Sequence, residues 1–399
     1  MDAYSSFRVR DYRFLVAGAF ISNFGLQMLS VAVSWDLYMQ TKSALVLGNV
    51  GFVQVAPFVM LSLLAGHFAD RYDRRRIMVI TQIVYLAVSL VLLITSRSPS
   101  SHPVAVIYGC LFFTAVARTF QGPARGAILS QIVPAELLGN AITWNSSAQE
   151  VASVSGPALA GLLLAVSGPP TAYAVQTACA VLTLVCFGLL RSRTVVATHN
   201  SKASPLEGLR FVRDNKLIFS AVTLDLFGVI FGGATALLPI FAVDILHAGP
   251  AALGWLRAAP SVGAVSMAVT MAHLPKIRRA GPVLIGAVAG FGVATIGFGI
   301  SRNFWLSLGL LALTGAFDNI SVVLRHSLLQ TRTPDWLRGR VLAVNNIFIS
   351  CSNQLGAVES GWTAAWFGAT PSVWGGGLAT LVVVVACAVL SPSLRRWRQ

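Results

Sequence analysis

The chain has 399 residues, of which 55% are hydrophobic and only 11% are charged, and its mean hydropathy is +0.73. Soluble globular proteins carry about 25% charged residues, so this composition excludes a soluble protein. The formal net charge of +15 would favour a nucleic-acid partner in a soluble chain. Here the positive residues gather in loops and termini on one side of the predicted membrane, and we expect no nucleic-acid partner.

Apolar runs of about 20 residues, enough for one helical crossing of a bilayer, recur along the whole chain. Positive residues concentrate on the cytoplasmic side of membrane proteins, which predicts that both termini and the central loop are cytoplasmic. An even number of spans requires that agreement, and we expect a multi-pass protein of a bacterial-type cytoplasmic (inner) membrane. The twelve predicted spans are 14–39, 45–66, 77–96, 104–125, 142–166, 171–190, 217–241, 250–273, 282–301, 304–325, 341–366 and 371–391.

The first span carries a polar stripe. Asn23, Gln27, Ser30 and Ser34 are spaced by four, three and four residues, which places them on one face of a helix. We expect this face to line a central substrate cavity. Asp36 lies beyond the stripe toward the outer end, where it is either a proton-coupling site or a structural acid.

A short loop between the second and third spans combines glycine, one acid and several arginines. Its key residues are Gly66, Asp70, Arg71, Arg74 and Arg75. Asp70 at a helix end can pair with arginine and face the positive N-terminus of another cytoplasmic helix. The pattern predicts a gating latch between two halves of the protein; the alternative is a simple positive-inside anchor.

The fourth span places Thr114, Arg118, Gln121 and Arg125 on one face, and Gln121 is a candidate for the substrate cavity. A charged side chain inside a bilayer should face a cavity or a partner. Glu150 in the fifth span lies at a depth that matches Arg118 within roughly one helical turn. We therefore predict an Arg118–Glu150 pair, which either takes part in proton coupling or is a static ion pair.

Three residues of the fifth span allow close helix packing. Gly156 and Gly161 are small enough for another helix to approach closely. Pro157 can bend the span.

The only long polar stretch is 191–216, which we predict to link an N-terminal bundle, 1–190, to a C-terminal bundle, 217–399. Within it, Pro205–Asn215 has apolar residues at roughly helical spacing after a start signal. This pattern predicts a short amphipathic helix lying under the membrane.

The second half repeats the first. Residues 111–161 and 311–361 align without a gap at an offset of 200 positions. The expected fold is therefore all-α, with twelve transmembrane helices in two pseudo-symmetric six-helix bundles and a substrate site between them. The coinciding residues include Thr114/Thr314, Arg125/Arg325, Asn145/Asn345, Gly156/Gly356 and Gly161/Gly361.

Polar residues also occur within the spans of the second half. Asp225 is a further candidate for proton coupling. The candidates for lining the substrate cavity are Asp318, Asn346 and Asn353.

Three of these motifs resemble those of the major facilitator superfamily. Gly66–Arg76 resembles its G-x-x-x-D-[RK]-x-G-[RK]-[RK] loop, with Asp73 in place of a glycine. Arg118–Gly122 resembles the R-x-x-Q-G motif, whose arginine that family associates with proton coupling. Gly156–Gly161 resembles the G-P-x-x-G-G core of its antiporter motif, with Ala160 in place of one glycine. Phe120–Arg125 and Ile132–Pro134 are similar to the branch that contains macrolide efflux proteins and the enterobactin exporter.

The resemblance implies the major facilitator fold and proton-coupled export of an amphipathic small molecule, drug-like or siderophore-like, by alternating access. We expect the protein to function in contact with membrane lipid and as a monomer, although the spacing of Gly228 and Gly232 and of Gly286 and Gly290 fits packing within a chain or between chains equally well. A lysophospholipid flippase or a solute uptake permease of the same fold remains an alternative. A polytopic membrane enzyme is the non-transport alternative, although we find no catalytic motif. The six histidines form no pair at ligand spacing, and we expect neither a metal nor a cofactor.

Overall fold

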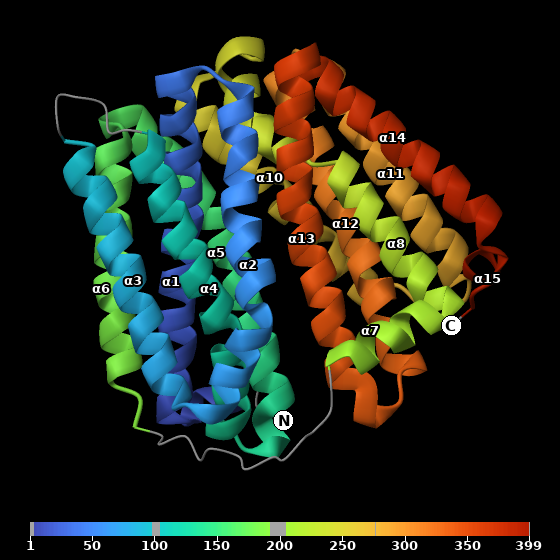
Figure 1. The fold of residues 1–399 in the computed structure, drawn as a ribbon, viewed down its shortest axis with the longest axis horizontal. Coiled ribbons are helices and arrows are strands. Elements are labelled where there is room, and N and C mark those ends of the chain that lie inside the picture. The colour runs from blue at the N-terminus through green and yellow to red at the C-terminus, as the bar shows by residue number, and fades with distance from the viewer. Residues whose placement is uncertain (1–3, 98–103, 192–204, 276, 399) are drawn as a thin grey trace. The chain divides into compact units, whose positions relative to one another are not determined.

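The computed structural model describes residues 4–97, 104–191, 205–275 and 277–398, without the side chains of Leu63, Asp70, Pro205 and Leu206. Within these residues, twelve helical segments are long and apolar enough to cross a membrane, as the sequence predicts. Figure 1 shows the ribbon. The first six spanning helices are α1 (Arg10–Thr41), α2 (Ala44–Arg71), α3 (Arg74–Thr95), α4 (Val104–Ile132), α5 (Leu138–Ser167) and α6 (Pro169–Gly188).

The remaining spans begin with α8 (Lys216–Phe231), which is followed by shorter pieces: a 3₁₀ turn (Ala234–Leu237), α9 (Leu238–Ile240) and a π-helical turn (Phe241–Ile245). The last five are α10 (Gly249–His273), α11 (Ala280–Ile300), α12 (Phe304–Arg332), α13 (Asp335–Phe367) and α14 (Ala369–Leu390). Short helices flank the spans: 3₁₀ turns at Ser5–Arg8 and Ala135–Leu137, α7 (Pro205–Asp214) and α15 (Pro392–Arg395).

Local signals in the sequence explain where several of these helices begin and end. Asp73 accepts a hydrogen bond from the Arg75 backbone N–H (2.9 Å) and so caps the N-terminus of α3. Asn303 caps α12 in the same way, through the backbone N–H groups of Trp305 and Leu306. The turn between α13 and α14 needs a positive φ of 92° at position 368, which glycine adopts without steric cost.

The chain forms two compact units by its internal contacts. Unit 1 comprises Met1–Lys42, Val53–His199 and Gly249–Ala258. Unit 2 comprises Ser43–Phe52, Asn200–Ala248 and Ala259–Gln399. The start of α2 thus belongs with unit 2, and the start of α10 with unit 1. The simple boundaries at 190 and 217 stay a prediction.

The two units repeat the same helix pairings. In unit 1, α1 packs against α5 and α6, and α3 packs against α4 and α6. In unit 2, α8 packs against α13 and α14, and α11 packs against α12 and α14. Five helices of each unit therefore have equivalent neighbours in the other, as the repeat of the sequence requires.

Two segments show structure that the hydropathy alone does not give. The seventh span is interrupted after Phe231. Next to this break, the backbone at Gly233 comes so close to Gly356 of α13 that a Cβ there would lie 2.7 Å from the Gly356 carbonyl carbon. The predicted linker helix is present as α7, and it packs on α13 and α8 within unit 2 (Figure 1). Its Glu207 forms an ion pair with Arg340 of α13.

Candidate functional site

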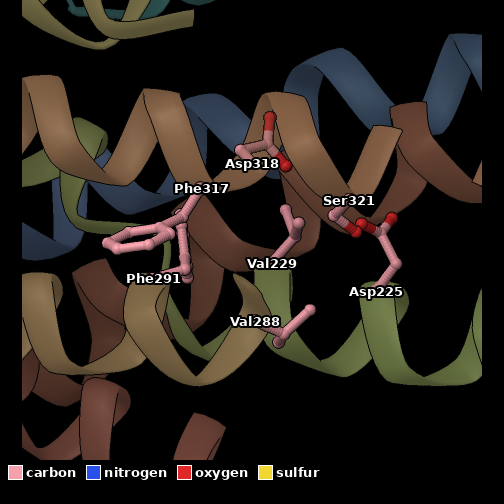
Figure 2. A pocket seen from close by; sticks show the side chains of 8 residues that line it. Asp225, Val229, Val288, Phe291, Phe317, Asp318 and Ser321 are labelled. Carbon is pink, nitrogen blue, oxygen red and sulfur yellow. The ribbon is translucent and has the colours of Figure 1, made fainter. Parts of the chain in front are cut away.

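A small pocket inside unit 2 brings polar side chains of α8 and α12 together (Figure 2). Its cavity volume is about 10 Å³, which is room for about one water molecule. The only side chains that α11 adds to the lining, Val288 and Phe291, are apolar. The full lining is Asp225, Gly228, Val229, Val288, Phe291, Phe317, Asp318 and Ser321.

Asp225 of α8, which lines the pocket, forms an ion pair with Arg325 of α12. The two residues are 5% and 2% exposed, so both charges are removed from solvent. Removing one partner of such a pair would leave a buried charge without compensation, which is strongly destabilising. The sequence predicted Asp225 as a coupling residue. It marked Arg325 only through the equivalent Arg125 of the repeat.

Asp318 and Ser321 lie one turn apart on α12 and both face the pocket (Figure 2). Ser321 is 2% exposed, and its hydroxyl lies near the Asp225 carboxylate without a well-oriented hydrogen bond to it. Asp318 makes no ion pair or side-chain hydrogen bond in the described part of the chain. The site therefore holds two carboxylates for one guanidinium.

The equivalent arginine of unit 1 has a different partner. Arg125 donates from Nη2 to Asn145 Oδ1 (2.8 Å), joining α4 to α5. The repeat counterpart Asn345 is 2% exposed, and neither of its amide atoms has a partner among the described residues. Arg325 therefore pairs with a carboxylate, whereas the equivalent Arg125 binds a neutral amide.

Asp36 takes part in a hydrogen-bond network of unit 1. It is 7% exposed, and its two carboxylate oxygens accept hydrogen bonds from Gln40 Nε2 (2.9 Å) and from the Tyr173 hydroxyl of α6 (2.9 Å). This arrangement suits the structural interpretation of Asp36, and its coupling role stays a prediction.

The predicted Arg118–Glu150 pair is wrong. Both side chains are exposed, and no ion pair joins them in the structure of the described residues. Equal depth along two helices does not fix the direction in which each side chain leaves its helix, and the prediction used depth alone. The neighbouring Gln121 keeps its Nε2 atom without a partner there. A part for either charge in coupling is still a prediction.

The polar stripe of α1 mostly connects helices. Asn23 Nδ2 donates to the Gln149 carbonyl of α5 (3.3 Å), and Gln27 Nε2 donates to the Ser153 hydroxyl of the same helix (3.2 Å). The remaining cavity candidates have separate environments: Ser30 accepts a hydrogen bond from Arg257 Nη2 (3.2 Å), Ser34 bonds the Val31 carbonyl, and Asn346 and Asn353 are exposed on α13. Their part in lining a substrate cavity stays a prediction.

Arginines of the loop between α2 and α3 hold helix ends inside unit 1. Arg74 is buried and donates to the carbonyls of Ala69 (3.1 Å) and Ala127 (3.4 Å). Arg75 donates to the carbonyls of Phe187 (3.3 Å) and Gly188 (2.5 Å) at the C-terminus of α6, where a cation also favours the helix dipole.

Gly66 and Arg71, the other described members of the gating motif, lie in open surroundings. Arg71 is exposed, and a Cβ on Gly66 would meet no atom within 4 Å. The side chain of Asp70 lies outside the part of the chain that the structure describes. The latch between halves remains a prediction.

The antiporter-like motif of α5 is a set of close backbone contacts. A Cβ on Gly156 would lie 2.8 Å from the Phe24 carbonyl oxygen, and one on Gly161 would lie 2.7 Å from Gly254 Cα. Pro157 lies within the same helix, and its carbonyl also approaches Gly254. Close approach is how small residues stabilise membrane helices.

Several partners of the site residues escaped the sequence analysis. Tyr173 and Gln40, which bind Asp36, carry no motif, although Gln40 is four residues from Asp36 on one helix. The position of Arg325 could have predicted its ion pair. An arginine within a membrane span is costly and requires a partner, and this arginine occurs at the same place in both repeats. Among the described residues, no three His, Cys, Asp or Glu side chains gather as metal ligands.

Twelve spanning segments and the repeated helix pairings define a multi-pass membrane transporter of the major facilitator type. The family model for transmembrane secretion effectors matches residues 1–399, and the chain belongs to that family. It is accordingly a transporter of small molecules in the inner membrane and not an enzyme.

Named relatives cover most of the chain. It is 28% identical over 396 residues to the enterobactin exporter EntS of Citrobacter koseri, covering 97% of this chain and 93% of that protein. It is 24% identical over 343 residues to the staphyloferrin A transporter of Staphylococcus aureus, covering 83% and 84%.

Solved structures share the fold at low sequence identity. A POT family transporter in complex with 5-aminolevulinic acid superimposes with a TM-score of 0.77 at 10% identity, covering 96% of each chain. A D-xylose–proton symporter gives 0.73 at 15% identity, covering 97% of this chain and 99% of the other. These likenesses agree with the predicted fold.

Proposed function

We propose that this protein exports a siderophore-like small molecule from the cytoplasm in exchange for protons. The observation that carries the proposal is the similarity to an enterobactin exporter over 97% of this chain, together with membership of a secretion family. A staphyloferrin A transporter among the relatives supports the same class of cargo. Alternating access of a cavity between two repeats is the mechanism that such folds use.

The proton part of the proposal is supported by the charges of unit 2. Ionisable residues inside a membrane are costly, and they mark ion pathways and proton relays by default. Asp225, Asp318 and Arg325 form such a cluster beside a pocket of one-water size. Asp36 lies outside this cluster, and both of its oxygens accept hydrogen bonds from side chains of unit 1.

The cargo part is supported by an unpaired cation on α4. Arg118 is exposed within a spanning helix and has neither an ion pair nor a hydrogen bond among the described residues. Guanidinium groups bind carboxylates and other planar anions through two parallel hydrogen bonds. Arg118 is therefore available for an acidic group of a siderophore-like cargo.

The proposed arrangement in the membrane follows the distribution of positive residues. Both termini lie in the cytoplasm, and the protein works as a monomer surrounded by lipid. Protonation from outside favours the return of the empty transporter to the inward-facing state, since a bound proton shifts the equilibrium between conformations that bind it differently.

The test uses everted vesicles, whose outer face is the cytoplasmic one, with an acidic lumen imposed. Catechol siderophores, citrate-type siderophores, macrolides, dyes and lysolipids are added in turn. The proposal predicts that a siderophore makes the lumen more alkaline, and that Arg118→Ala weakens this response. If lysolipid alone moves, and does so without regard to the pH gradient, the protein is a lipid flippase and the proposal is wrong.

A further inference from the structure

We infer that the pocket of unit 2 is the site of the coupled proton, that Asp318 takes it up, and that Asp225 is the fixed counterion of Arg325. Only the coupling of this proton to transport rests on the proposed function. The binding of a proton at Asp318 is a property of unit 2 that can be measured without cargo.

The count of charges requires a cation. Asp225 and Asp318 carry two negative charges when ionised, and Arg325 supplies one positive charge. An uncompensated charge away from water is costly, and such a group neutralises itself when it can. One proton makes the cluster neutral, and its loss leaves one net negative charge.

The size and lining of the pocket select a proton over a metal cation. The cavity has room for about one water molecule, which excludes an organic cargo. A hard metal cation gathers about six oxygen ligands. The lining provides oxygen side chains only from Asp225, Asp318 and Ser321, while Val229, Val288, Phe291 and Phe317 are apolar.

The hydroxyl of Ser321 has room for a further hydrogen bond in the pocket. This side chain is 2% exposed and lines the pocket, and its hydroxyl lies near the Asp225 carboxylate without a well-oriented hydrogen bond to it. A hydroxyl can both donate and accept a hydrogen bond. It can therefore stabilise either a water molecule that delivers the proton or the carboxylic acid that forms.

The surroundings of the two acids decide which of them changes its charge. Asp225 is held in an ion pair by Arg325, whereas Asp318 has no ion pair in the described part of the chain. The charged groups that act on Asp318 are Asp225 from α8 and Arg325 from its own helix. On α11 the lining is apolar. A hydronium ion thus gives its proton to a carboxylate oxygen of Asp318 and leaves as water, with no change of oxidation state.

The experiment is an infrared difference spectrum of the purified full chain between acidic and alkaline pH, in which a protonated carboxylic acid has its own carbonyl band. We expect a pH-dependent band in the wild type that is lost in Asp318→Asn. The matched control is Asp214→Asn, at an exposed position at the end of α7, which should keep the band. Persistence of the full band in Asp318→Asn would overturn the inference.

Two further variants keep the test decisive if Asp318→Asn folds poorly. Ser321→Ala should keep the band but shift its midpoint, because the hydroxyl beside the acid is gone. Asp225→Asn frees Arg325 to pair with Asp318, so the band should move to lower pH. A band unchanged in both variants would overturn the assignment, as would loss of the band when sodium replaces potassium.

The failure of the proposed function gives a different result. If the band depends on Asp318 but no siderophore moves protons in everted vesicles, the proton site stands and the cargo is wrong. If siderophore-driven proton movement is intact in Asp318→Asn, the function stands and the site is wrong.

Discussion

Arg125 of unit 1 and Arg325 of unit 2 occupy equivalent positions of the repeat, yet they bind different partners. Arg125 donates to the neutral amide of Asn145, whereas Arg325 pairs with the buried carboxylate of Asp225. Seven residues earlier the charges are opposite, with Arg118 in one unit and Asp318 in the other.

The two units differ in their charges but share the same close helix packing. Gly161 of unit 1 approaches Gly254, and its counterpart Gly361 of unit 2 approaches Gly48. Both repeats thus have the glycines that allow close helix contact, whereas their charged residues differ. An unpaired cation lies in one unit and an excess acid in the other, as an exchange of an anionic cargo for a proton would need.

The largest difference between the units should come from replacing the two equivalent arginines. Arg325→Ala leaves Asp225 buried without a partner, which should lower the free energy of unfolding by about 3–5 kcal/mol. Arg125→Ala removes one charged hydrogen bond to Asn145, worth about 1.5–3 kcal/mol. Thermal unfolding in detergent, followed by tryptophan fluorescence, compares the two.

The control for this comparison is the double variant Asp225→Leu/Arg325→Met, which removes both charges. It should regain much of the stability that Arg325→Ala loses, because no unpaired charge remains. Equal losses for the two single alanine variants would contradict the distinction between the units.

The Asp36 network of unit 1 gives the next effect. Tyr173→Phe deletes one of the hydrogen bonds to a buried carboxylate and should cost about 1.5–3 kcal/mol. Tyr12→Phe is a matched control, since the Tyr12 hydroxyl donates to the neutral Ala141 carbonyl (2.9 Å) and should be worth about 0.5–1.5 kcal/mol. The same unfolding assay measures both, and a larger loss for Tyr12→Phe would refute the role of Asp36 as a charged acceptor.

The glycine contacts test the similarity of the units. Gly161→Ala and Gly361→Ala each place a Cβ against a neighbouring backbone and should each cost about 1–3 kcal/mol. Gly126→Ala, where a Cβ meets no atom within 4 Å, should cost nothing. A loss in only one of the first two variants would show that the packing is not repeated.

The smallest effect is expected at the edge of unit 2. Glu207 is about half exposed, with 49% of its side-chain surface accessible, and its ion pair with Arg340 joins α7 to α13. Exposed pairs are worth about 0–1 kcal/mol, so Glu207→Gln should barely shift the unfolding temperature, and high salt should abolish the shift.

The sequence was informative wherever a periodic pattern determined the structure. Twelve spans, the repeat and the linker helix α7 follow from apolar run lengths and helical spacing. The break after Phe231 did not follow, nor did the close approach of Gly233 to Gly356, which joins residues more than a hundred positions apart.

The site was predictable in its residue types but not in its partners. Asp225 and Asp318 stood out as acids within spans, and Arg325 stood out through its repeat. Which acid meets which arginine depends on the rotation of each helix about its axis. That rotation is set by packing between helices, and the same gap made the Arg118–Glu150 prediction wrong.

The most direct test of the account is cargo-driven proton movement in everted vesicles, compared between the wild type and Asp318→Asn, with binding of the same siderophore measured in parallel. The account predicts that Asp318→Asn binds the siderophore but no longer moves protons, while Asp36→Asn still does. Undiminished proton movement in Asp318→Asn, with loss in Asp36→Asn, would contradict it and place coupling in unit 1.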